Sequence, residues 1–411
     1  MSLTSLPLAR ASCSRAVAVE QRSSRGVSRQ RDVDIRHVYE PPPARGYAAP
    51  VPTGENAATL TRELVRVAVA VTSDEKRVRR PAGRALFDHL ACLEAGQRAF
   101  PGLSAAAAAC ALDRDDLHWP SVTHPGAIVW PVVRECGGDA RAAAAGYEVT
   151  VRLGLALGPE HRRYWHTSAT AGTVGAAVAA ALALGLDEER VADAAGHAAS
   201  VAGGSILAIL ERSGTRVFHR SHAAGTGVAA ARAAEAGLRA TRKGLESERG
   251  LFAAMSGDPG ALLAERERLA IEETTFRIYA ASGFAHAAIE AARELAPIEL
   301  AERVEVQVPP AAAALAALPD PQTDEEAWWS TQYAVAVTLL GLDIEDRSLL
   351  HDPRVRALLR RVEMRVGETS IVTVDGRSAS CAEAHVPTDE ELDAKWRTLN
   401  PGLEPPLELL A

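Results

Sequence analysis

The densest group of side chains able to move protons occupies twelve residues, from Asp113 to His124. The segment contains three aspartates and two histidines, and it directly follows an alanine-rich apolar run that predicts the end of a buried helix. Acids and histidines held together on a loop at a helix end suit proton transfer on a carboxylate substrate. The alternative is a solvated surface loop, because clusters of charged residues are usually exposed.

Three further stretches break the apolar pattern: residues 164–173, 211–227 and 274–286. We interpret the first two as loops. The three stretches supply additional histidines and arginines, including His166, Arg216, His219, Arg277 and His286. Histidine changes its protonation state near neutral pH and can transfer protons. Arginine stays charged and can hold a carboxylate through two parallel hydrogen bonds.

Helices are expected to position most of these residues. Between residues 57 and 269 apolar side chains recur at steps of three and four, as at Leu60, Leu64 and Val67, which is typical of packed helices. Eight of the thirteen residues from 174 to 186 are alanine or glycine. Such a segment has almost no polar face, so it predicts a helix in the interior.

After Pro297 the helical period gives way to alternation, which predicts strands. The predicted strands are 304–308, 362–366, 370–374 and 377–384, with Asp375-Gly376 as the turn of a hairpin between the last two. Helices are predicted at 323–340, 353–361 and 389–398.

The sequence therefore predicts a mainly α protein with a large all-helical domain and a smaller α+β lid domain. The helical domain is expected to cover 57–269 and to be completed by the C-terminal segment 386–411, and the lid is expected to cover 270–385. Residues 1–56 are rich in Arg, Ser and Pro and lack hydrophobic periodicity, which predicts a disordered extension.

Composition narrows the class of protein further. Apolar residues make up 47% of the 411 residues but aromatic residues only 4%, so small side chains must build a closely packed helical core. The net charge of −8 argues against a nucleic-acid partner. The five cysteines are scattered without metal-binding spacing, and no apolar run is long enough to span a membrane. We expect no metal site and a cytoplasmic protein.

Six motifs occur in an order that resembles the MmgE/PrpD family, which includes 2-methylcitrate dehydratase, cis-aconitate decarboxylase and iminodisuccinate epimerase. The motifs are Asp113-x-Asp115-Asp116 followed by His124-Pro125-Gly126, the segment Ala145 to Val149, the loop from His166 to Gly175, the segment Thr215 to Ala224 around His219, the segment from Phe276 through Tyr279 to His286, and Tyr333 to Ala336. The resemblance extends over residues 57–400.

The resemblance implies a site between the helical domain and the lid, a small carboxylate substrate, no metal or organic cofactor, and usually a homodimer. It places the family's site positions at Asp113, His124, His166 and Tyr333. Two further positions that are normally lysine in the family are Arg216 and Arg277 here.

These residues lead to a hypothesis about roles. Arginine is a poor proton donor because its pKa lies above about 12, so Arg216 and Arg277 are expected to bind substrate carboxylates. Proton transfer then falls to His124 and His166. Tyr333 is expected as a further proton donor, and Asp113 is expected to orient a histidine.

Two more histidines, His219 and His286, are expected to help bind the substrate. The leading function is a lyase, either a hydro-lyase or a decarboxylase, that acts on a small di- or tricarboxylic acid. One alternative is an isomerase or epimerase of a small dicarboxylate, in which two groups exchange a proton on opposite faces of one carbon. Another is a member of the family that binds without catalysis, since both lysine positions are changed.

Overall fold

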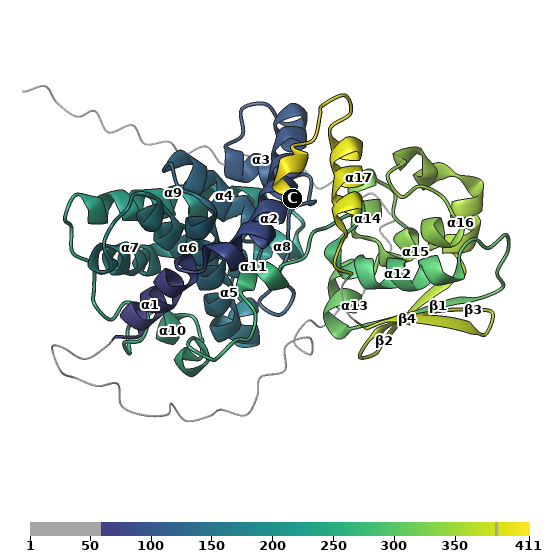
Figure 1. The fold of residues 1–411 in the computed structure, drawn as a ribbon. Helices are drawn as coiled ribbons and strands as arrows, with labels where there is room; N and C mark the ends of the chain where they lie inside the picture. Colours follow the sequence, from purple (N-terminus) through teal and green to yellow (C-terminus); the bar gives the residue numbers. More distant parts are fainter. Residues whose placement is uncertain (1–58, 383–384) are drawn as a thin grey trace, which may run out of the picture. The chain divides into compact units, whose positions relative to one another are not determined.

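The structure is a computed structural model that describes residues 59–382 and 385–411 (Figure 1). The predicted N-terminal extension lies outside these residues. The fold is mainly α, with a large helical domain and a smaller α+β domain, which confirms the predicted fold class.

The first part of the described chain is helical. Its helices are α1 (Leu60–Thr72), α2 (Glu75–Ala99), α3 (Ala105–Ala111), α4 (Gly126–Glu135), α5 (Ala140–Arg162), α6 (Thr167–Ala183), α7 (Glu188–Val201), α8 (Leu207–Leu210), α9 (Thr215–Glu235), α10 (Leu251–Ala254) and α11 (Ala270–Glu273). Several begin at a residue whose side chain accepts a hydrogen bond from the backbone of the first turn, as Thr59, Asp74, Ser104 and Asp139 do. Such caps satisfy amide groups that have no partner within the helix.

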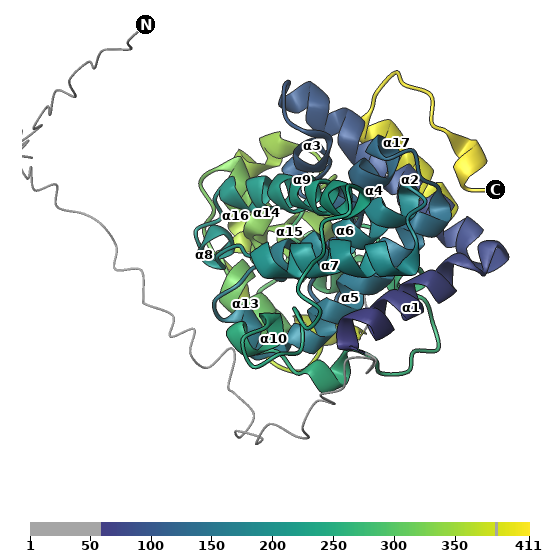
Figure 2. The ribbon, with the colours of Figure 1, turned by 90° about the vertical axis from the view of Figure 1, so that its left-hand side faces the viewer.

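The alanine-rich helix α6 lies in the interior, as predicted. It packs against α4, α5, α7 and α9, and Figure 2 shows these helices around it. The close approach of α5 and α6 depends on glycine, because a Cβ added at Gly175 would overlap Thr150 Oγ1 and lie 2.8 Å from the carbonyl oxygen of Gly146. Small side chains thus allow α6 to be buried on every side over most of its length.

The second part of the described chain contains a small sheet and its covering helices. The helices are α12 (His286–Leu295), α13 (Pro310–Ala316), α14 (Asp324–Trp329), α15 (Thr331–Leu339), α16 (Pro353–Leu359) and α17 (Asp389–Leu399). The strands are β1 (Val304–Val308), β2 (Val362–Val366), β3 (Ser370–Val374) and β4 (Arg377–Cys381), in the order β2-β1-β3-β4.

The sheet is mixed, and its register follows the alternation of the sequence. Strand β1 runs parallel to β2 and antiparallel to β3, and Val304 lies opposite Val362 on one side and Val374 on the other. The buried residues of β1 alternate with half-buried ones. Helix α12 packs on the sheet (Figure 1). The hairpin predicted from Asp375-Gly376 is confirmed, and both turn residues have positive φ.

Two sequence interpretations were wrong. The stretch 211–227, interpreted as a loop, is mostly helix α9, and the stretch 164–173 becomes helical at Thr167. The predicted helix 323–340 is divided at Ser330, whose hydroxyl caps α15 by accepting from Tyr333 N and also bonds to the Leu318 carbonyl.

The last helix, α17, packs against α2, far away in the sequence. The rings of Phe87 and Trp396 lie 5.4 Å apart, and Asn400 Nδ2 donates to the Ala91 carbonyl at 3.1 Å. Lys395 Nζ forms a fully buried ion pair with Asp88. These contacts tie the C-terminal segment to the helical part of the chain.

Candidate active site

The loop that follows α3 is joined to the segment after α11 by a short antiparallel bridge. Leu117 N donates to the Thr275 carbonyl at 2.9 Å, and Thr275 N donates back to the Leu117 carbonyl at 3.0 Å. Just beyond the bridge, Arg277 Nε donates to the Asp115 carbonyl at 2.8 Å, and its Nη2 pairs with the Asp115 carboxylate. Two polar segments separated by some 160 residues therefore meet at one place.

Asp116 anchors the loop from inside. Its carboxylate accepts hydrogen bonds from Gly126 N at 2.9 and 3.1 Å and from Tyr147 Oη at 2.7 Å. Burial raises the pKa of Asp116 to about 7. The space is so restricted that a Cβ added at Gly126 would lie 2.5 Å from Tyr147 Oη. The loop geometry thus depends on a glycine at the start of α4.

His124 is held in one orientation by hydrogen bonds of its amide and its ring. Its amide donates to Ser168 Oγ at 3.2 Å, and its Nδ1 lies 2.6 Å from the Asp116 carbonyl oxygen. Because a carbonyl only accepts, Nδ1 carries the proton of the neutral ring, and Nε2 is left as an acceptor. Burial lowers the pKa of His124, although the Asp115 carboxylate at 3.4 Å opposes this shift.

His166 lies immediately before α6 and pairs with a second histidine. Its amide donates to the Gly204 carbonyl at 2.8 Å, and its Nδ1 lies 3.1 Å from Nδ1 of His219. Only one of these two nitrogens can carry the shared proton. Burial, together with the positive charge of Arg220, lowers the pKa of His166 well below its usual value.

Three arginines surround two aspartates beside these histidines. Arg216 pairs with Asp113, and Arg277 pairs with Asp115. Arg220 Nε lies 3.5 Å from the second oxygen of Asp115. Arg216 and Arg220 stand four residues apart on α9, so one helix face presents both guanidinium groups.

The loop, the two histidines and the arginines border one cavity of about 220 Å³. Its lining includes five of the eight residues predicted for the site, namely Asp113, His124, His166, Arg216 and Arg277, together with Arg220. The remaining lining residues are mostly apolar.

Comparison with known protein families gives two matches. The model of the MmgE/PrpD N-terminal domain matches residues 101–263, and the model of the MmgE/PrpD C-terminal domain matches residues 279–405. The chain belongs to the MmgE/PrpD family. The two matches confirm the resemblance inferred from the sequence motifs. No match to an individual curated protein was found.

MmgE/PrpD proteins are largely enzymes, and the family includes dehydratases, other lyases and isomerases. The cavity draws on residues from both matched regions. His124, His166 and Arg216 lie in the N-terminal match, and Trp329 lies in the C-terminal match. Arg277 falls in the short interval between the two matches.

Three predicted site residues lie outside the cavity lining. His219 reaches the site only through His166. Tyr333 belongs to the apolar cluster around β1 and α15, and burial raises its pKa. His286 packs edge-on against Tyr279, its Nε2 lies 3.3 Å from the Ala281 carbonyl oxygen, and burial lowers its pKa to about 3. The structure does not bring Tyr333 or His286 to the two cavity histidines.

The hydrogen-bond partner of Asp113 also differs from the one expected. It was expected to orient a histidine, but its carboxylate accepts from Arg216, and the group beside His124 is Asp115. Asp113 has a φ of 53°. This left-handed conformation is uncommon for a residue other than glycine.

Sequence reasoning did not single out Arg220 as a site residue. The sequence did contain a helical signal, because steps of three and four residues separate Arg216, Arg220, Ala223 and Gly227. Such spacing indicates a single helix face with a polar end. The stretch was instead interpreted as a loop because of its charged residues.

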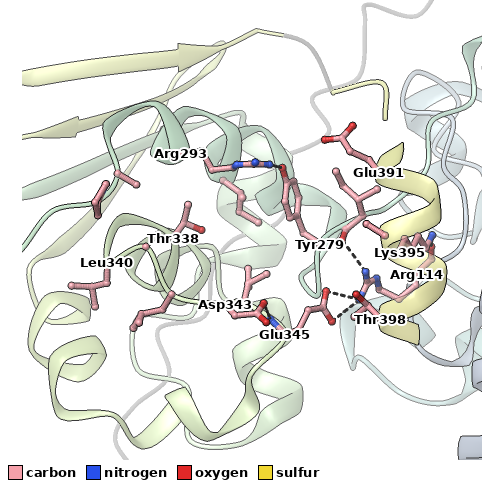
Figure 3. Close-up of a pocket in the computed structure, with 18 residues that line it drawn as sticks. Arg114, Tyr279, Arg293, Thr338, Leu340, Asp343, Glu345, Glu391, Lys395 and Thr398 are labelled. Atoms are coloured by element: carbon pink, nitrogen blue, oxygen red, sulfur yellow. Dashed lines mark hydrogen bonds and ion pairs between the residues drawn. The ribbon is translucent and has the colours of Figure 1, made fainter. Parts of the chain in front are cut away.

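Arg114 secures the loop through a separate set of partners. Its Nη1 donates to both carboxylate oxygens of Glu345 at 2.8 and 2.9 Å, and its Nη2 donates to the Ile278 carbonyl at 2.8 Å, as Figure 3 shows. Lys395 Nζ donates to the Arg114 carbonyl at 2.6 Å. These residues line a second, larger pocket of about 670 Å³.

Within residues 59–382 and 385–411 no group of three or more His, Cys, Asp or Glu side chains is placed to hold a metal ion. No helix of that part of the chain is long and apolar enough to cross a membrane.

Proposed function

We propose that the protein is a lyase that removes water or carbon dioxide from a small di- or tricarboxylic acid. The observation that carries this proposal is the convergence of His124 and His166 with Arg216, Arg220 and Arg277 on one cavity. Lyase chemistry on such acids needs a cation to bind carboxylate, a base and a proton donor, and this lining offers all three.

His124 is the proposed base. Its Nδ1 proton is directed to the Asp116 carbonyl, so Nε2 has a lone pair for a substrate proton. Burial lowers its pKa, which keeps the ring neutral at pH 7. In a dehydration His124 takes the proton from the carbon beside a carboxylate, and the electrons of that C–H bond form the new double bond.

His166 is the proposed donor, with His219 as its relay. When His219 Nδ1 donates to His166 Nδ1, the proton of His166 lies on Nε2. His166 then passes this proton to the departing hydroxyl, which leaves as water, and takes the shared proton from His219. His219 regains a proton at Nε2 from outside the cavity. In a decarboxylation the same proton goes to the carbon that loses carbon dioxide.

Arg216 and Arg277 are the proposed carboxylate ligands, alongside their pairing with aspartates. Arg216 Nε is buried and makes no hydrogen bond to any described residue. Arg277 uses Nε and Nη2 for Asp115, so Nη1 still has donors for a substrate oxygen.

The test compares His124→Ala and His166→Ala with wild type on a panel of small carboxylic acids. We expect each variant to lose about 10²–10⁴-fold in turnover, the usual contribution of a general acid or base. The matched control is His351→Ala, since His351 is exposed and lies outside the cavity lining. Near-normal turnover in both cavity variants would contradict the proposed roles.

An epimerase is the second candidate, because His124 and His166 approach one cavity from different elements. Two groups that face one carbon from opposite sides could exchange its proton. In deuterated buffer, label uptake without loss of water or carbon dioxide would mark this reaction. A member that binds without catalysis would be stabilised by an acid that it never turns over.

We further propose that residues 57–269 and 386–411 form the helical domain and that residues 270–385 form the lid domain. We also propose that the protein is a homodimer. The buried contacts of Lys395 with Asp88 and Arg114 support the grouping of the last segment with the helical domain. Light scattering on the purified protein would test the dimer, and a monomer at micromolar concentration would contradict it.

A further inference from the structure

The site carries one cation beyond those that its aspartates neutralise. Asp113 pairs with Arg216 and Asp115 pairs with Arg277. Arg220 is only 2% exposed, and its Nε, which has no hydrogen-bond partner among the described residues, lies 3.5 Å from the same Asp115 carboxylate that pairs with Arg277. Three guanidinium groups therefore share two carboxylates, and because burial of an unmatched charge is costly, the positive charge at Arg220 is prepared to receive an anion.

Apart from Arg162, Thr167 and Ser282, the rest of the cavity lining is apolar. We define the apolar wall as Ile206, Ile209, Ala311, Leu315 and Trp329, which come from α8, its N-terminal flank, α13 and α14. Leu117, Trp119, Val122 and Phe284 extend the apolar lining. A hydroxyl or carboxylate placed against these side chains would lose its hydrogen bonds to water and gain none, at a cost of about 1–3 kcal/mol by mutational data.

The apolar wall is fixed in place by a residue that spans its two sides. Arg212 follows α8, and its Nη2 donates to the Leu315 carbonyl at 3.3 Å. Its guanidinium also lies over the ring of Trp329, 5.7 Å from the centroid. These contacts connect α8 with α13 and α14.

The aromatic part of the lining is also closely packed. The rings of Trp119 and Phe284 meet edge to face with centroids 5.9 Å apart. A Cβ added at the neighbouring Gly283 would lie 3.1 Å from the Trp119 ring and 3.2 Å from Leu117. The apolar lining is therefore a formed surface to which both parts of the chain contribute.

We infer that the substrate of this site is a carboxylic acid with an alkyl or aryl substituent, whose carboxylate binds Arg220 and whose substituent packs on the apolar wall. A purely polar acid of the citrate type would leave the apolar wall uncovered. The inference rests on the proposed function for the position of the reacting groups, but its binding component can be measured separately.

The test uses succinate and its 2-methyl, 2-propyl and 2-phenyl derivatives, with affinity measured by calorimetry on the full chain. We expect affinity to rise about fourfold for each CH₂ group buried. Leu315→Asn should flatten this rise, whereas Leu300→Asn should not, because Leu300 is 76% exposed. Affinity that stays level or falls along the series in wild type would overturn the inference.

Arg220 is tested by Arg220→Met and Arg220→Lys. The methionine variant should weaken every member of the series by a similar factor, because it removes the common carboxylate contact, and lysine should restore part of the loss. If the methionine variant fails to fold, the Leu315→Asn comparison still decides the inference. Unchanged affinities in a folded Arg220→Met variant would overturn the assigned carboxylate contact.

Turnover is measured on malate and its 3-methyl, 3-propyl and 3-phenyl derivatives, because the succinates have no hydroxyl to lose as water and no keto group to accept the electrons of a departing carboxylate. Tighter binding of the substituted succinates, without loss of water from any of these malates, would support the inference and contradict the proposed dehydration. Turnover of the malates at rates that do not depend on the substituent would contradict the inference and leave the lyase proposal standing. Binding of no member of the succinate series would overturn the inference alone.

Discussion

Replacement of Gly126 by alanine should disturb the candidate site directly. The new Cβ would lie 2.5 Å from Tyr147 Oη, 2.7 Å from Asp116 Oδ2 and 2.9 Å from Asp116 Cγ. These atoms belong to the hydrogen bonds that hold the loop. Overpacking costs about 1–3 kcal/mol, and loss of a buried hydrogen bond to a charged group about 1.5–3 kcal/mol. We expect a total loss of about 2.5–6 kcal/mol.

The assay is urea unfolding of Gly126→Ala beside a matched control, Gly225→Ala. Gly225 lies in α9, and nothing lies within 4 Å of a Cβ added there. The control should therefore gain up to about 1 kcal/mol from helix propensity. In a Tyr147→Phe background, where the nearest clashing atom is absent, the cost of Gly126→Ala should be smaller.

Activity provides a second measurement for the same variant. Because His124 Nδ1 bonds to the carbonyl of Asp116, a displaced Asp116 should move the proposed base. Turnover of the best acid in the panel should then fall about tenfold or more, as expected for a small misplacement of a catalytic group. A Gly126→Ala protein with the stability and turnover of wild type would refute the reasoning.

Three further predictions concern buried charge and titration. Lys395→Met should cost about 3–5 kcal/mol because it leaves the Asp88 carboxylate buried without its partner, and a Lys395→Met/Asp88→Asn double variant should recover part of that loss in urea unfolding. Stability should fall by about 1.4 kcal/mol per histidine for each pH unit below about 6.5. The reason is that the unfolded chain then binds protons, while burial holds the pKa of four folded histidines at about 3 or 4: His89, His118, His161 and His286. Urea titrations from pH 7.5 to 5 check this, and constant stability would contradict it. Because burial also lowers the pKa of His124 and His166, the acid limb of the kcat/KM profile should lie below pH 6.5, and a limb above pH 7 would contradict a buried base.

The sheet could be predicted almost residue by residue. Strands β1, β2 and β3 have the bounds that alternation predicts, and the turn at Asp375-Gly376 lies where its residues place it. A strand with one buried face has a period of two, and that period is visible within five residues. The interior helix α6 was equally clear from its lack of polar residues.

The polar face of α9 was not recognised, for a physical reason. Charged residues in a sequence are normally assigned to solvent, but Arg216 and Arg220 turn toward a cavity where they lie beside Asp113 and Asp115. Those partners lie about a hundred residues earlier. A pairing over such a distance leaves no periodic signal, so the helix was interpreted as a loop.

The role expected for Tyr333 shows a related limit of prediction from sequence motifs. Its motif position suggested the site, but its side chain packs in the apolar cluster beside the sheet. The order of motifs identified the family correctly, whereas the direction of one side chain depends on how α15 is capped at Ser330 and rotated against its neighbours.

The contact between Lys395 and the backbone of Arg114 has a consequence for biosynthesis. Translation proceeds from the N-terminus, so α17 leaves the ribosome after every other element that touches the loop between Asp113 and His124. Until then the Asp88 carboxylate has no counter-ion. A nascent chain would therefore hold this loop without its contact to Lys395 until α17 has emerged.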